Sequence, residues 1–162
     1  MKGLDDFLTN EPNMGKFSKK THKEDYGLWE VFSLFIRLRD SNYDGIGKCI
    51  SCNQHFFYKL TDCGHFIPRT HKATKYDERN NNLQCVGCNR LKEGNLEAYA
   101  SSLERKWGIG ITDELKAKSR LIMKYSENDF NQMRAEYKVK IGSLLMKKSS
   151  EVNHLVLKII GR

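Results

Sequence analysis

Two cysteine pairs of identical spacing are the clearest chemical feature of the sequence. Cys49 and Cys52 form one Cys-x2-Cys pair, and Cys85 and Cys88 form the second. Such a pair places two thiolates on one tight turn, and two turns complete the tetrahedral set that Zn2+ binds at about 2.3 Å. We therefore predict a structural zinc site at these residues, with four unligated structural cysteines as the alternative. An ion held there would close a long loop and supply folding free energy.

The remaining cysteine, Cys63, lies between the two pairs. The number of cysteines is odd, and the N-terminus has acidic residues where a secretory signal would have an apolar stretch. Both features argue against a disulfide framework. We expect Cys63 to be a small buried core residue rather than a fifth thiol near the metal, because free cysteines are commonly buried.

The segment between and just after the pairs carries residue types that could hydrolyse a phosphodiester. His65 could take a proton from water, while Asp62 and Asn89 could hold Mg2+ or Mn2+ to stabilise the departing oxygen. If 62–67 is a strand, alternation places Asp62 and position 64 on one face and His65 on the other, unless a bulge at Gly64 relaxes this. Asn89 is expected near a helix N-terminus, where backbone N–H groups favour an anion.

The same region resembles a family of phage nucleases. Its motifs are Asp-x-Gly-His at 62–65, Arg69, Tyr76 before an acid, an Asn upstream of Gln-Cys, Cys-x-x-Cys-Asn at 85–89, Gly-Asn at 94–95, and Tyr99. Their order resembles the HNH (ββα-metal) endonucleases, and 49–108 closely resembles the phage lambda NinG (Rap) recombination nucleases, with weaker agreement to about residue 141. The resemblance implies cutting of branched intermediates such as Holliday junctions and D-loops, leaving 5′-phosphate and 3′-hydroxyl ends.

The resemblance also implies roles for single residues. His65 matches the general-base histidine, and Asn89 takes the position of the last His or Asn of the HNH pattern, a ligand of the catalytic divalent ion. Asn80 best matches the middle Asn, which braces the loop and orients the histidine, although Asn81 and Asn82 compete for that assignment. Gly64 departs from the pattern, because an Asp or His that binds metal often precedes the base.

Asp62 is our candidate for the missing ligand, since positions two apart on a strand share a face. Each of these residues also has a structural alternative. Asp62 could pair with Lys59 or Arg69, Asn89 could cap the helix that follows it, and His65 could be a structural or surface histidine.

Basic residues surround the candidate catalytic residues. The sequence has 28 Lys+Arg against 20 Asp+Glu, a net charge of +8, which favours a polyanionic partner. No helix presents a row of Arg, Asn and Gln for base edges, so we expect recognition of DNA shape rather than sequence. The predicted nucleic-acid contacts are Arg69, His71, Lys72, Lys75, Arg79, Arg90 and Lys92.

The helices and strands expected around these residues indicate an α+β fold. We predict a zinc-bound ββα-metal (HNH) nuclease core with flanking N- and C-terminal helices. The expected parts are a flexible N-terminal arm at 1–22, a helix packing on the core at 23–44, the HNH-like core at 45–108, C-terminal helices at 109–148 and a tail at 149–162. Within the core we expect two short strands near 49–67 and a long exposed loop over the polar residues 68–82. Ser126 and Asp129 predict a further helix start.

Together these features predict a metal-dependent DNA endonuclease that cuts branched recombination intermediates. The alternatives are a non-catalytic zinc DNA-binding module and an HNH nuclease of restriction or homing type. The longest apolar runs are too short for a membrane span, so we expect a cytoplasmic protein, in a bacterial host if phage-encoded. Symmetrical cutting of a four-way junction would need two active centres, which favours a homodimer, with the aromatic helix around Trp29 and Phe32 as its candidate contact.

Overall fold

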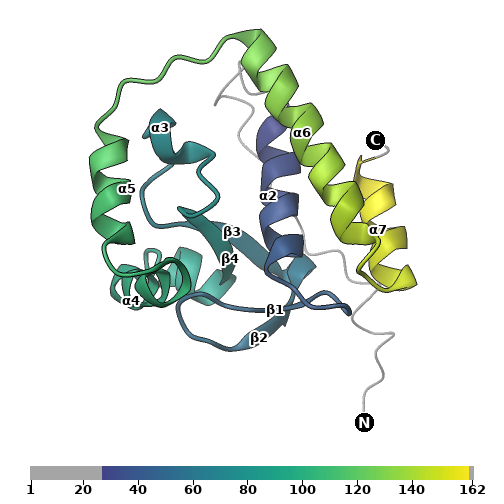
Figure 1. The fold of residues 1–162 in the computed structure, drawn as a ribbon. Helices are drawn as coiled ribbons and strands as arrows, with labels where there is room; N and C mark the ends of the chain where they lie inside the picture. Colours follow the sequence, from purple (N-terminus) through teal and green to yellow (C-terminus); the bar gives the residue numbers. More distant parts are fainter. Residues whose placement is uncertain (1–26, 161–162) are drawn as a thin grey trace.

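The computed structural model describes residues 27–160, so the predicted arm at 1–22 lies outside them. The fold mixes helices with two small antiparallel sheets (Figure 1). The elements are α2 (Leu28–Arg39), β1 (Ile46–Lys48), β2 (His55–Phe57), the 3-10 turn η1 (Tyr58–Leu60), β3 (Thr61–His65), α3 (Lys72–Lys75), β4 (Asn81–Cys85), the π-helical turn η2 (Gly87–Leu91), α4 (Leu96–Trp107), α5 (Ile111–Ser119), α6 (Glu127–Leu145) and α7 (Ser150–Ile160).

Two hairpins carry the candidate site. β1 pairs with β2, and β3 pairs with β4 in an unbroken register that runs from Thr61 opposite Cys85 to His65 opposite Asn81. Because directly opposite residues of an antiparallel pair share a face, Asp62, Gly64, Asn82 and Gln84 lie on one side of the second hairpin. Position 65 lies on the other side, as alternation predicted, and no bulge at Gly64 changes this.

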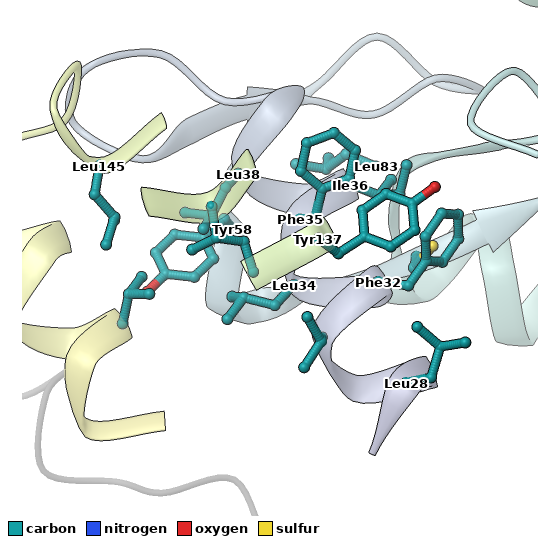
Figure 2. Packing of buried hydrophobic residues seen from close by; sticks show 14 of the residues in the cluster. Leu28, Phe32, Leu34, Phe35, Ile36, Leu38, Tyr58, Leu83, Tyr137 and Leu145 are labelled. Carbon is teal, nitrogen blue, oxygen red and sulfur yellow. The ribbon is translucent and has the colours of Figure 1, made fainter. Parts of the chain in front are cut away.

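Helix α2 is the centre of the main hydrophobic core. It lies between the β3–β4 hairpin and α6 (Figure 1) and buries residues around most of its surface, as its apolar sequence predicted. Phe32 makes edge contacts with Tyr76 and Tyr137 at ring-centroid distances of 5.4 and 5.0 Å, and Figure 2 shows Tyr137 beside Phe32 and Phe35. Each fully buried Leu, Ile or Phe in such a core contributes roughly 1.5–3 kcal/mol.

This packing corrects one expectation about the surface of the helix. The side chain of Phe32 is fully buried by α6 of the same chain, so it is not available as a dimer contact. Trp29 packs on the same core and carries the guanidinium of Arg69 over its ring, at 4.7 Å from the centroid.

A smaller cluster holds α4 and α5 against the segment that follows β3. It consists of Ile67, Tyr99, Leu103, Ile111 and Leu115. The phenol of Tyr99 donates to the carbonyl of Gly64 at 3.0 Å, which ties α4 to the hairpin next to the candidate site.

The C-terminal helices follow local signals of different strength. Ser126 and Asp129 form the predicted capping box at the start of α6. Residues Ser150–Ile160, which the sequence left as a tail, form the helix α7, with Val152 and Val156 buried on one face. None of the helices in the part of the chain that the structure describes is long and apolar enough to span a membrane.

The expectation of a long exposed loop at 68–82 is wrong. This segment contains α3 and the start of β4, and Asn80, Asn81 and Asn82 are fully buried. Polar side chains can be buried when every amide group finds a partner. Here the amide nitrogens donate to backbone carbonyls of residues 67–79 and to the phenol of Tyr99. The second strand of the site-bearing hairpin was therefore missed because its sequence is polar.

Candidate functional site

Four cysteines from two chain turns form a compact group of metal ligands. One Sγ from each of Cys49, Cys52, Cys85 and Cys88 lies within 4.8 Å of the other three. The sulfurs of Cys52 and Cys85 are 3.9 Å apart, close to the roughly 3.8 Å edge of a tetrahedron of four sulfurs around zinc. The four cysteines can hold a metal ion such as zinc, as the sequence predicted, and Cys63 is buried in the main core away from them.

Backbone turns orient the sulfurs. Asn53 takes a left-handed conformation with φ of 62°, which closes the turn after Cys52. The backbone N–H of Cys85 donates to Sγ of Cys49 at 3.3 Å, and that of Cys88 donates to Sγ of Cys85 at 3.4 Å. N–H donors of this kind stabilise thiolates, the form in which cysteine binds zinc.

Gln84 connects this cysteine group to the hairpin and to α4. Its Nε2 donates to Oγ of Ser51 at 2.7 Å and to the carbonyl of Gly94 at 2.6 Å. A Cβ at position 64 would lie 2.2 Å from Oε1 of Gln84, so a larger residue fits there only if Gln84 moves. The departure from the HNH pattern at position 64 thus has a steric reason, because the amide of Gln84 fills that space.

Asp62 and Asn89 meet on the α4 side of the hairpin. Nδ2 of Asn89 donates to Oδ2 of Asp62 at 2.8 Å, and Arg90 donates to both carboxylate oxygens at 2.7 and 2.8 Å. The partner of Asp62 is therefore Arg90 rather than Lys59 or Arg69. Burial raises the pKa of Asp62, but the hydrogen bonds from Arg90 and Asn89 outweigh it and lower that pKa overall.

Asn89 was expected at the start of a regular α-helix. It lies instead inside the π-helical turn η2. Its amide nitrogen donates to Asp62, so the side-chain carbonyl oxygen is the atom of Asn89 that could bind a metal ion. Carboxylate and amide oxygens are the donor types that Mg2+ and Mn2+ prefer. The donor set at Asp62 and Asn89 therefore fits such an ion chemically, with the guanidinium of Arg90 as its competitor for the carboxylate.

His65 ends β3 on the opposite face of the hairpin. Its Nδ1 is buried without a hydrogen-bond partner. Burial, and to a smaller extent the charge of Arg69, lower the pKa of His65 from 6.5 to about 4. The imidazole is therefore neutral near pH 7, and no hydrogen bond within the described residues joins it to Asp62 or Asn89.

Asn80 braces the segment that follows His65. Its Oδ1 accepts from the backbone N–H of Ile67 at 2.7 Å, and its Nδ2 donates to the carbonyls of Ile67 and Thr74. Asn81 and Asn82 make similar bonds to carbonyls between Lys75 and Arg79. All three asparagines therefore hold one loop, and Asn80 is the one whose side chain bonds the backbone of Ile67, two residues after His65.

The residues predicted to contact nucleic acid differ in whether their side chains already have partners within the protein. Arg79 is paired with Asp77 and Glu114, and Arg90 is paired with Asp62. The ring of His71 lies 3.3 Å from the carbonyl of Ser119, and the ammonium of Lys75 lies over the ring of Tyr76. Arg69, Lys72 and Lys92 are exposed at the surface.

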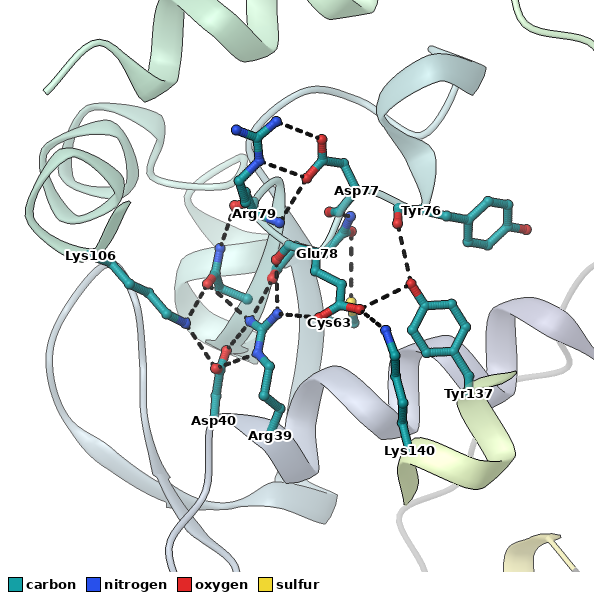
Figure 3. Close-up of polar contacts among 12 residues, drawn as sticks. Arg39, Asp40, Cys63, Tyr76, Asp77, Glu78, Arg79, Lys106, Tyr137 and Lys140 are labelled. Atoms are coloured by element: carbon teal, nitrogen blue, oxygen red, sulfur yellow. Dashed lines mark hydrogen bonds and ion pairs between the residues drawn. The ribbon is translucent and has the colours of Figure 1, made fainter. Parts of the chain in front are cut away.

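One polar network was not predicted. Asp40 accepts hydrogen bonds from Arg39 and Lys106 (Figure 3). It also accepts from the backbone N–H of Leu83, and Lys106 donates to Asn82 as well. Burial raises the pKa of Asp40, but Arg39 and Lys106 outweigh burial and lower it overall. The network ties the end of α2 and the end of α4 to β4. The sequence offers no local signal for it, because its members are far apart in the chain.

Comparison with known proteins gives one consistent match. The sequence model of the family described as "Bacteriophage Lambda NinG protein" matches residues 14–148. Protein ninG of Salmonella phage P22 is 33% identical over 118 residues, which cover 71% of this chain and 54% of that protein. Protein ninG of Escherichia phage lambda is 31% identical over 118 residues, with the same coverage. The chain thus spans about half the length of these curated relatives, and no solved structure matches it significantly.

Proposed function

The chain belongs to the bacteriophage lambda NinG family, and on that premise we propose that it is a metal-dependent DNA endonuclease of HNH type that cuts branched recombination intermediates. The observation that carries the proposal is His65, a neutral imidazole whose Nδ1 is buried without a hydrogen-bond partner, at the end of a strand that the cysteine group anchors. A buried histidine without a structural partner costs stability, and such groups are concentrated at functional sites.

His65 has the protonation state that a general base needs. Only the neutral ring can accept a proton from water, and a pKa of about 4 keeps it neutral throughout the physiological range. Arg69, four residues further on, is exposed and close enough to His65 to lower its pKa. In the proposed reaction Arg69 binds the scissile phosphate and His65 accepts the proton of the attacking water.

The surrounding structure keeps the imidazole in place. Asn80 fixes the backbone at Ile67, two residues after His65, and the cysteine group fixes the opposite end of the same hairpin. A catalytic base needs its position held to a fraction of an ångström, and rigid hairpins supply this better than loops. We assign Asn80 a positioning role, and Zn2+ at the four cysteines a structural one.

Asp62 and Asn89 are the proposed ligands of a catalytic Mg2+ or Mn2+. When bound, such an ion supplies Lewis-acid stabilisation of the developing charge on the phosphate and the leaving oxygen. Asp62 offers an ionised carboxylate and Asn89 a carbonyl oxygen. Arg90 has to leave the carboxylate first, and its side chain, 62% exposed, is free to do so toward solvent.

A second candidate function is a non-catalytic zinc DNA-binding module. The observation that favours it is the Asp62–Arg90 ion pair at 2.7 Å, because Arg90 already neutralises the carboxylate and no metal ion is needed there. In that case His65 is a core histidine, and the basic surface alone defines the function.

A panel of labelled DNA substrates tests the proposal. Zinc-saturated protein is incubated at equal salt with a four-way junction, a flap and a linear duplex of the same sequence, with and without Mg2+. The nuclease proposal predicts Mg2+-dependent cutting with a preference for branched substrates, and sedimentation on junction DNA tests whether a dimer does the cutting. Binding without cutting by any divalent ion would favour the binding module, and equal cutting of linear duplex would favour a restriction or homing type.

A further inference from the structure

A cationic hollow lies between the end of β1 and the C-terminal half of α4. Its volume is about 400 Å³, and it is open to solvent. The basic residues in its lining are Lys48, Arg105 and Lys106, and the other members include Asn53 and Ser102. None of the three cations belongs to the predicted DNA contacts, which lie in the segments 69–79 and 90–92.

The positive charge of this hollow is not compensated locally. Its one carboxylate, Asp40, has a side chain only 12% exposed and is already bonded by Arg39 and Lys106. Figure 3 shows Lys106 extending from α4 toward Asp40 and Arg39. The remaining cations, Lys48 and Arg105, form no ion pair within the described part of the chain, and both are exposed.

The guanidinium of Arg105 is oriented rather than free. It donates to Oγ of Ser101 at 3.1 Å and to Oγ of Ser102 at 2.7 Å. Hydroxyl partners fix the geometry of a guanidinium without neutralising it, so its charge remains available to an anion. An oriented guanidinium beside an exposed ammonium suits the phosphate oxygens of a nucleic-acid backbone, which Arg binds in bidentate fashion.

The hollow also has a fixed frame. Cys49, a member of the cysteine group, lies in its lining next to Lys48, and the N–H of Ile50 donates to the carbonyl of Leu83 at 3.0 Å. The Asp40–Lys106–Asn82 bonds fix its other wall to β4. A phosphate bound there would therefore have a defined place relative to the hairpin that carries His65.

We infer that this hollow is a second DNA-backbone site, which binds phosphates of another arm of the branched substrate while the scissile strand lies at His65. The inference rests on the proposed function for its substrate. Two separated backbone sites contact phosphates without reading bases, and a branched substrate can present one arm to each of them.

The test is a charge reversal on the full chain. Lys48→Glu with Arg105→Glu removes the uncompensated cations and leaves Lys106, which is part of the Asp40 network, intact. The matched control is Lys138→Glu with Lys147→Glu, the same charge change at exposed positions of α6 and the turn after it. Binding of a labelled four-way junction is measured over a salt series in zinc-saturated buffer without Mg2+.

The hollow variant is expected to bind the junction about tenfold more weakly. The slope of log binding constant against log salt concentration should fall in magnitude by about two, because each neutralised phosphate contributes about 0.9 to it. The control is expected to keep the slope of the unmodified protein. Equal binding by the two variants would overturn the inference. Zinc content and melting temperature verify folding, and if the reversal does not fold, Lys48→Ala with Arg105→Ala, expected to show a smaller loss in the same direction, replaces it.

Cleavage measured on the same samples separates this inference from the proposed function. Loss of junction binding by the hollow variant supports the second site even if the unmodified protein cuts nothing with Mg2+. Cutting by the unmodified protein together with unchanged binding by the hollow variant supports the nuclease and removes the second site. A failure of the unmodified protein to bind DNA overturns both.

Discussion

At the scale of single residues, the protonation state of His65 is the first testable quantity. Burial and Arg69 lower its pKa to about 4, whereas an exposed histidine titrates near 6.5. We predict that the His65 ring remains neutral down to about pH 5, and NMR titration with assignment by His65→Gln measures it. Since the unfolded chain takes up this proton at higher pH than the folded one, His65 lowers the free energy of unfolding as pH falls from 6.5 toward 4. A ring that titrates near 6.5 would contradict the burial of its nitrogen.

Arg90 and a divalent ion compete for the same carboxylate. Arg90→Ala should therefore raise the affinity of zinc-saturated protein for Mn2+ by about fivefold, the scale of one exposed ion pair of about 1 kcal/mol. Asp62→Asn should abolish that binding, and Arg120→Ala, at an exposed position, should leave it unchanged. Electron paramagnetic resonance of free Mn2+ gives the affinity without an activity assay. Unchanged Mn2+ affinity in both Arg90→Ala and Asp62→Asn would remove Asp62 as a ligand.

Gly64 is restricted by its neighbour rather than by its backbone. A methyl group there meets Oε1 and Cβ of Gln84 at 2.2 and 2.7 Å, so Gly64→Ala should lower the free energy of unfolding by about 1–3 kcal/mol. Gly142→Ala is the matched control, because nothing lies within 4 Å of its Cβ in α6 and alanine favours a helix. Denaturant unfolding of zinc-saturated protein compares the two, and a Gly64→Ala variant as stable as the control would mean that Gln84 can move aside.

At the scale of the elements, the cysteine group joins the β1–β2 hairpin to the β3–β4 hairpin. Cys85→Ser should release the metal and cause a loss of several kcal/mol of stability, because a structural zinc site supplies folding free energy. Cys63→Ala removes a thiol that lies outside the group, so it should keep one zinc per chain and cost far less. Metal analysis with thermal melting distinguishes these outcomes. Zinc lost from Cys63→Ala, or kept by a folded Cys85→Ser, would contradict the assignment.

Elements with strong local signals were predictable from the sequence, and those determined by distant partners were not. The cysteine spacing, the apolar α2 and the capping box at Ser126 depend on nearby residues, and the structure contains each of them. β4 begins with buried asparagines whose amides bond loop carbonyls, and hydrophobic patterning cannot identify such a strand. The Asp62–Arg90 pair joins positions on different elements and was likewise missed.

At the scale of the whole molecule, the cysteine group holds two hairpins against each other, and α2 and α4 cover opposite faces of the second one. His65 faces one side of that hairpin, and Asp62 with Asn89 faces the other. In the proposed reaction one phosphodiester has to reach both groups, and the hollow at Lys48 and Arg105 adds a further cationic surface.

The most direct measurement compares single-turnover cleavage of a labelled four-way junction by zinc-saturated His65→Gln and His55→Gln in Mg2+. His55 is an exposed histidine on β2 and serves as the control. Removing a general base should slow cutting by about 10²–10⁴-fold, with junction affinity and zinc content unchanged, while the control cuts like the unmodified protein. Equal rates for the two variants would show that His65 is not the base.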